Sequence, residues 1–374
     1  MGHKRMKIAI LGIRGIPANY GGFETFAEEL APRLVERGHE VTVYGRSNNI
    51  RYSADVYKGV RLVILPTIPT KHLDTVAHTF ISVFHALPGG FDAILMCNAA
   101  NAVFCAVPRL AGIPVALNVD GIERKRKKWG VAGRTHYLIS EILSTFIPNV
   151  VVTDAVVIRD YYKKRHKTAS VMIAYGTDLR HTDETGLLES LGLETRKYLL
   201  YVSRLEPENN AHLAIEAYRS VETSMPLVIV GDAPYAAAYI ERLKSMADPR
   251  VRFTGSIYGD GYLELRCHAY AYVQATEVGG THPALLEAMG SGNCILAKDT
   301  PEHHEVLEET GLYFDDVDDL VPLLKKVLSD PELASAYRQK TLDRARAVYS
   351  WDVITDEYED LFRRMVAGGR RRGA

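Results

Sequence analysis

The chain has 374 residues, too many for one ordinary core, and its hydrophobic content of 47% is enough for two. Its formal net charge of −1 excludes a general attraction to nucleic acid or to an anionic membrane, so binding of either kind would need a local patch. The four cysteines are widely spaced and form no C-x-x-C motif, which favours buried free thiols in a reducing compartment over a metal site or a disulfide framework.

The first half of the chain alternates short apolar runs with helical patterns. The run KIAILGI, residues 7–13, is nearly continuous and rich in β-branched residues, which is typical of a strand buried on both faces of a parallel sheet. Residues 21–39 then carry apolar side chains at helical spacing, and a second helical stretch is predicted at 135–146. Further strands are predicted at 40–46, 60–65, 92–97, 114–119 and 149–154.

The second half of the chain repeats this alternation. Strands are predicted at 198–203, 226–232, 251–255, 271–276, 294–299 and 311–315, and helices at 211–221, 235–246, 283–290 and 318–328. Strands that alternate with helices are joined by right-handed crossovers and build doubly wound parallel sheets. The sequence therefore predicts an α/β fold with two doubly wound, Rossmann-like domains.

The boundary between the two domains is predicted at a hinge. The segment MIAYGTDLRHTDE, residues 172–184, is the end of a strand followed by glycine and polar residues. We therefore expect an N-terminal domain of residues 1–174 and a C-terminal domain of residues 175–350, facing each other across a cleft, with ligands at the carboxyl ends of the strands. The last segment, 351–374, is predicted to be an amphipathic helix whose apolar face holds Trp351, Ile354, Tyr358, Leu361 and Phe362.

A glycine-rich turn, GIRGIPANYGGFET at 12–25, follows the first strand and opens a helix. Free backbone N–H groups and the helix dipole at such a turn suit a phosphate group. The spacing matches neither G-x-G-x-x-G nor the P-loop. The pairs Gly12/Gly15 and Gly21/Gly22 favour a ligand loop, and the alternative is a tight turn that binds nothing.

A cation follows the first strand of the second half. In YVSRLEPENN, residues 201–210, Arg204 stands just beyond the carboxyl end of the predicted strand. A guanidinium at this position can hold phosphate oxygens with two parallel hydrogen bonds. The alternative is a structural salt bridge from Arg204 to Glu206 or Glu208.

The stretch EVGGTHPALLEAMGSG, residues 277–292, joins bare backbone to a helix start. Gly279, Gly280 and Thr281 precede a helix with a proline in its first turn, so their amides can face an anion. Glu287 lies about one turn into that helix, where a carboxylate can bind the diol of a ribose. The alternative is a solvated helix acid.

These motifs, in this order, resemble the family-four retaining glycosyltransferases, which have the GT-B fold, and the resemblance runs through most of the chain. With NVDGIERKRKKWG, residues 118–130, they are similar to a bacterial subgroup that includes rhamnosyltransferases of cell-surface polysaccharide assembly. The motifs are specific for the fold and superfamily and much less so for the sugar. The resemblance implies an acceptor-side first domain, a nucleotide-sugar-binding second domain, and a final helix that crosses back onto the first domain.

The resemblance assigns donor-binding roles in the second domain. Arg204 matches the arginine that grips the donor diphosphate. Asn209 stands where a lysine is expected, and we expect Asn209 to contact the donor from this position. The change removes one cation, so the diphosphate must depend more on Arg204 and on backbone amides. Glu287 matches the second glutamate of an E-x7-E motif, which binds the ribose. Gly279 occupies the place of the first glutamate. Either the loop has two extra residues and Glu277 reaches the donor sugar, or backbone groups do so.

The resemblance also assigns roles in the first domain. Gly21 and Gly22 match a glycine pair that approaches the donor phosphate. Asp120 follows a strand where many relatives place an active-site histidine. We expect Asp120 to accept the proton of the acceptor hydroxyl or to bond a hydroxyl of the donor sugar. The alternative is an Asx turn before Gly121.

Five consecutive cations follow Asp120: Arg124, Lys125, Arg126, Lys127 and Lys128. The run follows a strand end that should face the acceptor, so we expect it to hold a phosphorylated acceptor or to contact an anionic membrane surface, with Trp129 at the interface. The alternative is a solvated charged face. Nucleic acid is excluded as a partner, because the run has no interleaved aromatic residues and no basic domain around it.

The sequence thus predicts a hexosyltransferase-type glycosyltransferase that retains the configuration of the sugar. The donor would be a nucleotide diphosphate sugar, with dTDP-rhamnose and a UDP-sugar as candidates, and the acceptor a hydroxyl of a glycan or of a polyprenyl-diphosphate-linked glycan. Two alternatives stay open: a sugar-nucleotide 2-epimerase, and a non-catalytic protein that binds nucleotide sugars.

No metal or other cofactor is expected. The D-x-x-D-D pattern at 315–319 is better explained as a strand exit and helix cap than as a metal site, and the histidines show no metal-ligand spacing.

The N-terminal apolar run is too short for a signal peptide and no stretch has the length of a membrane helix. We therefore expect a cytoplasmic protein, either free or peripheral at the inner face of the membrane.

Overall fold

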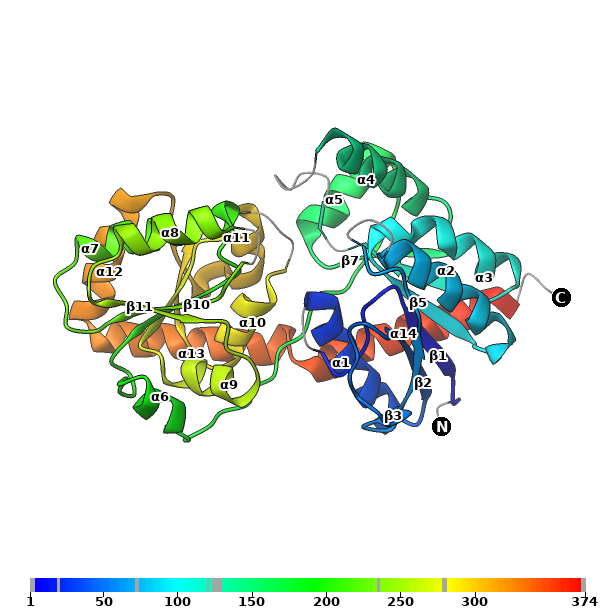
Figure 1. Cartoon of the computed structure of the whole chain (residues 1–374), viewed down its shortest axis with the longest axis horizontal. Helices are drawn as coiled ribbons and strands as arrows, with labels where there is room; N and C mark the ends of the chain where they lie inside the picture. Colours follow the sequence, from blue (N-terminus) through cyan, green and yellow to red (C-terminus); the bar gives the residue numbers. More distant parts are fainter. Residues whose placement is uncertain are drawn as a thin grey trace. The chain divides into compact units, whose positions relative to one another are not determined.

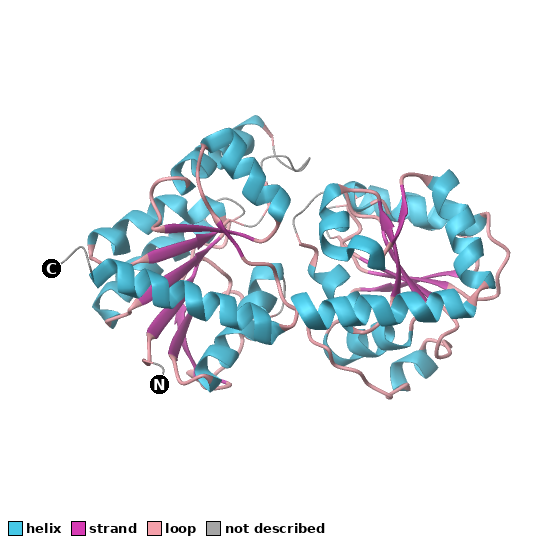
Figure 2. Cartoon of the chain, turned by 180° about the vertical axis from the view of Figure 1, so that it is seen from behind, coloured by secondary structure: helices cyan, strands magenta, loops and turns pink. Residues whose placement is uncertain are grey.

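The computed structural model describes residues 4–18, 21–70, 74–119, 121–122, 130–233, 236–277 and 281–370. The chain divides into two compact units. Unit 1 comprises Met1–Tyr175 together with Trp351–Ala374, and unit 2 comprises Gly176–Ser350. In each unit a parallel sheet lies between helices (Figure 2), which confirms the predicted α/β class with two parallel-sheet domains.

The described sheet of unit 1 has eight strands in the order β3-β4-β2-β1-β5-β6-β7-β8. Their bounds are β1 Lys7–Leu11, β2 Glu40–Arg46, β3 Val56–Tyr57, β4 Val60–Leu65, β5 Ala93–Cys97, β6 Val115–Asn118, β7 Val150–Thr153 and β8 Val171–Met172. The short edge strand β3 is antiparallel to β4, whereas the other pairs are parallel. Strands β1 and β5 are almost wholly buried because helices cover both faces of the sheet.

The helices of unit 1 form two layers. The helices are α1 Gly22–Glu36, α2 Asp74–Ala86, α3 Ala106–Leu110, α4 Val131–Ser144, α5 Val156–His166 and α14 Trp351–Arg370, with 3₁₀ turns η1 Leu87–Gly89 and η2 Ala99–Cys105. The crossover from β1 to β2 through α1 runs toward the β3 edge of the sheet. The crossovers from β4 onward run toward the β8 edge. Right-handed crossovers therefore place α2, η2, α3, α4 and α5 on one face, and α1 packs with α14 on the other (Figure 1).

Helix α14 packs on unit 1 through the apolar face predicted from the sequence, and the burial of that face is confirmed: Trp351, Ile354, Tyr358, Leu361 and Phe362 are all buried. The ring of Tyr358 lies 5.2 Å from that of Phe26 in α1, and its hydroxyl accepts a hydrogen bond of 2.9 Å from the side-chain amide of Asn118. Because Asn118 ends β6, the last helix of the chain is bonded directly to the carboxyl edge of the unit 1 sheet.

Glu359 ties α14 to the segment between α1 and β2. Its carboxylate lies 3.0 Å from Nε2 of His39 and 3.2 Å from Nη1 of Arg37, and it also pairs with Arg363 on its own helix. Partial burial raises the pKa of Glu359, but the hydrogen bonds from these three side chains outweigh that effect and lower the pKa to about 2.

Glu359→Gln is expected to destabilise unit 1 by about 2 kcal/mol at neutral pH. Because the folded pKa is depressed, the carboxylate stabilises the fold above its unfolded pKa of 4.5, and this contribution is lost as pH falls toward about 2. Urea unfolding at pH 7 and at about pH 3 should therefore show a smaller difference between variant and parent at the lower pH. Asp360→Asn, on the exposed side of the same helix, is the control; an equal loss at both pH values would contradict the assignment.

The described sheet of unit 2 has six strands in the order β11-β10-β9-β12-β13-β14, all parallel. The strands are β9 Leu199–Val202, β10 Leu227–Val230, β11 Val251–Gly255, β12 Ala271–Gln274, β13 Cys294–Lys298 and β14 Leu312–Phe314. The helices are α6 Gly186–Ser190, α7 Ala211–Arg219, α8 Ala237–Met246, α9 Gly259–His268, α10 Pro283–Gly290, α11 Pro301–Leu307, α12 Val317–Ser329 and α13 Pro331–Val348, with 3₁₀ turns η4 Pro207–Asn209 and η5 Glu308–Thr310.

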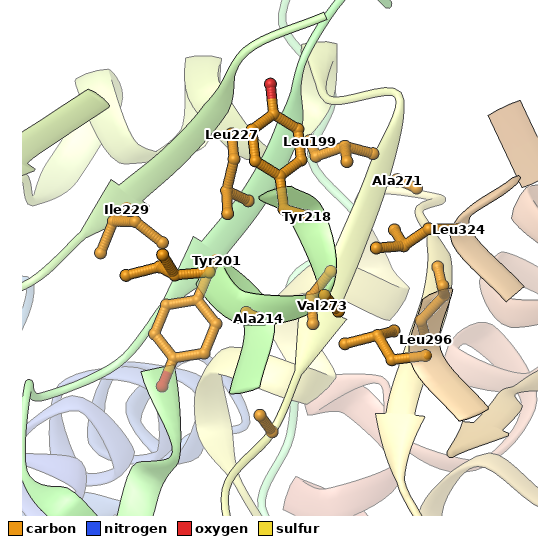
Figure 3. Close-up of a cluster of buried hydrophobic side chains, with 14 of the residues drawn as sticks. Leu199, Tyr201, Ala214, Tyr218, Leu227, Ile229, Ala271, Val273, Leu296 and Leu324 are labelled. Atoms are coloured by element: carbon orange, nitrogen blue, oxygen red, sulfur yellow. The ribbon is translucent and has the colours of Figure 1, made fainter. Parts of the chain in front are cut away.

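One core cluster of unit 2 lies between one face of its sheet and helices that include α7, α8 and α12. Figure 3 shows alternate side chains of β9, Leu199 and Tyr201, against Tyr218 of α7 and the neighbouring strand residues. Tyr201 is fully buried, yet its hydroxyl finds partners in the β9–α7 loop. This core therefore fixes the loop that follows β9, which carries Arg204.

Two smaller predictions can be assessed on the fold. All four cysteines are buried, as expected for structural thiols. Asp316 caps α12 by accepting hydrogen bonds from the backbone N–H groups of Asp318 and Asp319, which confirms the helix cap predicted at 315–319. Within the described residues, no helix combines the length and apolar character needed to cross a membrane.

Candidate functional site

The carboxyl edge of the unit 2 sheet brings two of the predicted segments together. Strands β9 and β12 are neighbours in the sheet, and their following loops are joined by hydrogen bonds. The N–H of Glu277 donates to the carbonyl of Glu208 at 3.2 Å, and the side-chain amide of Asn210 donates to the carbonyl of Ala275 at 3.1 Å. The Arg204 loop and the segment that begins the 277–292 motif therefore lie side by side at the edge where parallel α/β sheets bind ligands.

Arg204 projects from this edge with 42% of its side chain exposed. Its Nη1 lies 3.7 Å from Oε1 of Glu206, which is an ion-pair distance but longer than a hydrogen bond. An exposed pair of this kind contributes little to stability. The structural salt bridge considered from the sequence is therefore formed only loosely, and it leaves the guanidinium able to bind a ligand.

Asn209 is buried and is bonded to the loop itself. Its side-chain amide donates to the carbonyl of Arg204 at 2.6 Å, and its own carbonyl accepts a hydrogen bond of 2.5 Å from the hydroxyl of Tyr201. The side chain at 209 thus shapes the turn that presents Arg204. Contact between Asn209 and a donor, predicted from the sequence, stays a prediction.

The end of the next strand, β10, comes unusually close to β9. Gly231 has φ +143°, and a Cβ atom at this position would lie 1.8 Å from the carbonyl oxygen of Ser203. Any side chain would force the two strand ends apart, because that separation is far below van der Waals contact. Gly231 therefore fixes the backbone directly before Arg204.

Glu277 lies beside a cation that the sequence analysis did not single out. Nζ of Lys298, at the end of β13, is 3.9 Å from Oε1 of Glu277 and bonds Oδ1 and the carbonyl oxygen of Asp315 at 2.6 and 2.7 Å. Lys298 is only 8% exposed, whereas the Glu277 side chain is 45% exposed. In the sequence, Lys298 is distinguished only as a lysine that ends an otherwise apolar strand.

Glu287 is held inside the unit near α9. Its carboxylate lies 3.8 Å from Nη1 of the buried Arg266, and the side chain is 25% exposed. Burial raises the pKa of Tyr262, also on α9, well above its usual value, and the neighbouring Glu287 carboxylate raises it further. Glu287 is therefore not a solvated helix acid: it balances a buried guanidinium, and part of it remains accessible to a ligand.

In unit 1 the glycine-rich loop is stabilised by carboxylates of the helix it precedes. Oε1 of Glu24 accepts the N–H of Arg14 at 2.8 Å, and Oε2 of Glu28 accepts the N–H of Ala18 at 3.0 Å. Burial raises the pKa of Glu24, while the Arg14 amide lowers it. Two of the amides that we expected to be free are therefore occupied. No pattern in the sequence indicated that acids in the first two helical turns would fold back onto the loop.

The two glycines of this loop remain accessible. Gly21 caps α1 with φ +105°, Gly22 begins the helix, and both are exposed. Their contact with a donor phosphate stays a prediction.

Several predicted residues lie outside the described residues: Asp120, Gly279, Gly280, Arg124, Lys125, Arg126, Lys127 and Lys128. Thr281 is described, and it is buried directly before α10.

Both halves of the chain match glycosyltransferase families. Residues 20–179 match the family described as Glycosyltransferase Family 4. Residues 186–344 match Glycosyl transferases group 1, and this second match covers β9–β14 with Arg204, Glu277 and Glu287.

Solved structures share the fold over nearly the whole chain. A sucrose-phosphate synthase from Thermosynechococcus elongatus has a TM-score of 0.83 at 19% identity and covers 97% of this chain and 100% of its own. The Anabaena protein HepE, solved in complex with UDP-glucose, has a TM-score of 0.76 at 17% identity, over 96% of this chain and 99% of its own. At these identities the likeness shows the fold alone, and it confirms the predicted GT-B class.

A curated relative is similar over part of its length. The N-acetylgalactosamine-N,N'-diacetylbacillosaminyl-diphospho-undecaprenol 4-alpha-N-acetylgalactosaminyltransferase of Campylobacter jejuni subsp. jejuni serotype O:2 is 26% identical over 180 residues, which are 46% of this chain and 48% of that protein. The match thus spans about half the length of this relative.

Proposed function

The chain belongs, through its two halves, to the glycosyltransferases of Family 4 and group 1, and we propose that it transfers a sugar from a nucleotide diphosphate sugar to an acceptor hydroxyl. The observation that carries the proposal is the carboxyl edge of the unit 2 sheet. There an accessible guanidinium, Arg204, adjoins the Glu277 segment, and the same loop leads into the helix that bears Glu287.

Each donor group would meet a suitable protein group at this edge. Arg204 would bind the diphosphate with its planar fork, together with the backbone amides of Gly279, Gly280 and Thr281. Glu287 would accept hydrogen bonds from the ribose hydroxyls, and Glu277 would do so from the sugar. Lys298 would hold the Glu277 carboxylate in position from its buried site.

In the proposed reaction the acceptor oxygen forms a bond to the anomeric carbon, and the bond from that carbon to the diphosphate breaks. The acceptor proton passes to a base, for which Asp120 is our candidate. Negative charge develops on the departing diphosphate, and Arg204 and the amides would stabilise it more strongly as it grows, which lowers the barrier. We propose that the sugar keeps its anomeric configuration, as the family resemblance implies.

The nature of donor and acceptor is also a proposal. The UDP-glucose complex of the Anabaena protein supports a UDP-sugar as donor, and the subgroup resemblance supports dTDP-rhamnose. The undecaprenol-linked substrate in the name of the Campylobacter relative supports a polyprenyl-diphosphate-linked glycan as acceptor. With such an acceptor the protein would work in the cytoplasm, at the inner face of the membrane.

A donor panel tests the proposal. Calorimetry with UDP-glucose, UDP-N-acetylglucosamine, GDP-mannose and dTDP-rhamnose should show binding of one nucleotide class, and NMR should then show slow release of free sugar without acceptor. A donor epimerised at C2 would support the 2-epimerase instead. Binding with no turnover, with or without acceptor glycans, would support the non-catalytic protein. The anomeric coupling constant of a transferred product would test retention.

Neutralising the five cations at 124–128 to glutamine is expected to raise the apparent KM for a lipid-linked acceptor roughly tenfold at low salt, because each cation near an anionic surface contributes up to about 1 kcal/mol. Donor hydrolysis should not change. Salt screens such attractions, so the parent should lose transfer with rising ionic strength more steeply than the variant.

The control for this variant neutralises five exposed cations of unit 2: Arg242, Lys325, Lys326, Lys340 and Arg346. This control should keep the acceptor kinetics of the parent. If the 124–128 variant does the same at low salt, the run is a solvated face and the acceptor is bound elsewhere.

A further inference from the structure

Large apolar side chains are exposed on one layer of unit 1. The described residues have thirteen exposed large hydrophobic side chains, and eight of them lie on α2, η2, α3 and α4 or directly after α4. We call these eight the apolar face: Phe80, Ile81, Phe84, Val103, Leu110, Ile139, Ile142 and Phe146. The other five lie apart from this layer: Tyr52, Val56 and Ile68 in unit 1, and Tyr258 and Val348 in unit 2. The exposure is therefore concentrated on one layer of unit 1.

The elements that carry the apolar face adjoin one another. The ring of Phe80 lies 4.9 Å from that of Phe84 and 6.4 Å from that of Phe104 in η2, and η2 packs against both α2 and α4. Nη1 of Arg109 in α3 donates to the carbonyl of Phe146 at 2.7 Å, which fixes the end of α3 beside the end of α4. In Figure 1, α2 is drawn between α3 and α4, and all three lie along one side of the unit 1 sheet.

The last two turns of helix α4 are amphipathic in the opposite sense to a helix on a water-facing surface, whereas residues 134–136, nearer its start, are exposed and polar. Its buried side holds polar residues: the Ser144 hydroxyl lies 3.2 Å from that of Tyr162, and Glu141 pairs with His166 at 2.6 Å. Its exposed side carries Ile139 and Ile142, with 52% and 45% of each residue exposed. A surface helix normally turns its apolar side toward the core. This inversion indicates that the outer face of the last two turns of α4 meets an apolar medium.

The surroundings of the apolar face are basic. The last turn of α5, which packs beside α4, carries Lys163, Lys164, Arg165 and, as its C-cap, Lys167. The acids of the same region are neutralised or buried: Asp160 pairs with Arg159 at 3.0 Å, and Glu141 and Asp154 are buried. The exposed charge beside the apolar face is therefore positive.

From these observations we propose that the apolar face docks the protein on an anionic lipid bilayer. Its aromatic and aliphatic side chains enter the boundary between headgroups and acyl chains, and the α5 cations attract the anionic headgroups. A second copy of the chain would suit the face less well, because a two-fold interface would bring the α5 cations of both copies toward each other. The docking residues are distinct from the run at 124–128 and from the donor-binding groups of unit 2, so the proposal stands apart from the catalytic assignment.

Co-sedimentation of the full chain with vesicles tests the proposal. The parent should bind vesicles that contain about 30% phosphatidylglycerol, and bind phosphatidylcholine vesicles more weakly. The variant Ile139→Ser, Ile142→Ser, Phe146→Ser should lose roughly tenfold or more of this binding. The variant Lys163→Gln, Lys164→Gln, Lys167→Gln should show a smaller preference for anionic lipid than the parent. Circular dichroism melts of each variant confirm that it is folded.

The control Tyr258→Ser, Val348→Ser removes exposed apolar side chains from unit 2 and should bind vesicles as the parent does. Equal binding by the parent and the α4 variant would overturn the proposal. The proposal would also be overturned if the parent did not bind vesicles and light scattering showed a dimer that the α4 variant does not form. The apolar face would then be an interface between two copies of the chain. Donor affinity in solution should be the same in all these variants, so a failure of donor binding would count against the proposed function alone.

Discussion

Glu287→Gln is expected to weaken binding of the bare nucleoside diphosphate by about 10- to 100-fold, and to weaken donor binding equally. A hydrogen bond to a charged group contributes about 1.5–3 kcal/mol, and about 1.4 kcal/mol corresponds to a factor of ten in affinity. Glutamine keeps the length and shape of the side chain but offers one weaker acceptor and a donor in place of the carboxylate. Because the ribose belongs to the nucleotide, calorimetry with the nucleotide alone should already show the loss.

The position of Glu287 adds a second effect that has to be separated from binding. Arg266 is buried 3.8 Å away, so removing the carboxylate leaves a buried guanidinium with less compensation and lowers the stability of unit 2. Melting temperatures with and without saturating nucleotide separate the two effects. Glu332→Gln, on the exposed side of α13, is the matched control. If Glu287→Gln is folded and binds the nucleotide as the parent does, the carboxylate serves only Arg266 and the ribose assignment is wrong.

The strands and helices were predictable where an apolar run is closed by turn residues. The bounds of β2, β4 and α10 agree with the predicted 40–46, 60–65 and 283–290 because each is delimited by glycine, proline or charge. Helix α4 was located but its orientation was not, because periodicity defines an apolar side without showing which side the sheet covers. The inverted orientation of α4 becomes visible only once its neighbours are placed.

The candidate site was also predictable only in part. The place of Arg204 follows from a predicted strand end, and the neighbouring place of Glu277 follows from the pairing of β9 with β12. Lys298 and Arg266 were missed because they lie outside the motif, at the end of β13 and on α9, and their residue types are unremarkable on a strand or helix. A motif shows which groups can bind a ligand, whereas the charges that hold those groups in place depend on the tertiary fold.

Arg204→Ala is expected to lower kcat/KM by about 10²- to 10³-fold, with most of the loss in kcat, because charge on the leaving diphosphate is greatest in the transition state. Arg204→Lys should recover only part of this loss, since an ammonium is a point charge without the planar fork. The β9–α7 loop, residues 203–210, contains no lysine that could replace the charge of Arg204. Asn209 occupies the position where the family resemblance places a lysine, and its side chain donates to the Arg204 carbonyl.

The hydrogen bond from Asn209 to the Arg204 carbonyl limits how much activity a lysine at position 209 can restore. Asn209→Lys in the Arg204→Ala background should return roughly a tenth of the lost activity or less. The substitution removes the 2.6 Å hydrogen bond that shapes the turn, and the new cation must move out of a buried position to reach the diphosphate. In the parent background the same substitution should slow transfer, because it disturbs the turn that presents Arg204. Arg242→Ala, an exposed arginine of α8, is the control and should leave kcat/KM unchanged. Parental turnover in a folded Arg204→Ala variant would show that the diphosphate is held by backbone amides without this side chain, and the role of the guanidinium would have to be abandoned.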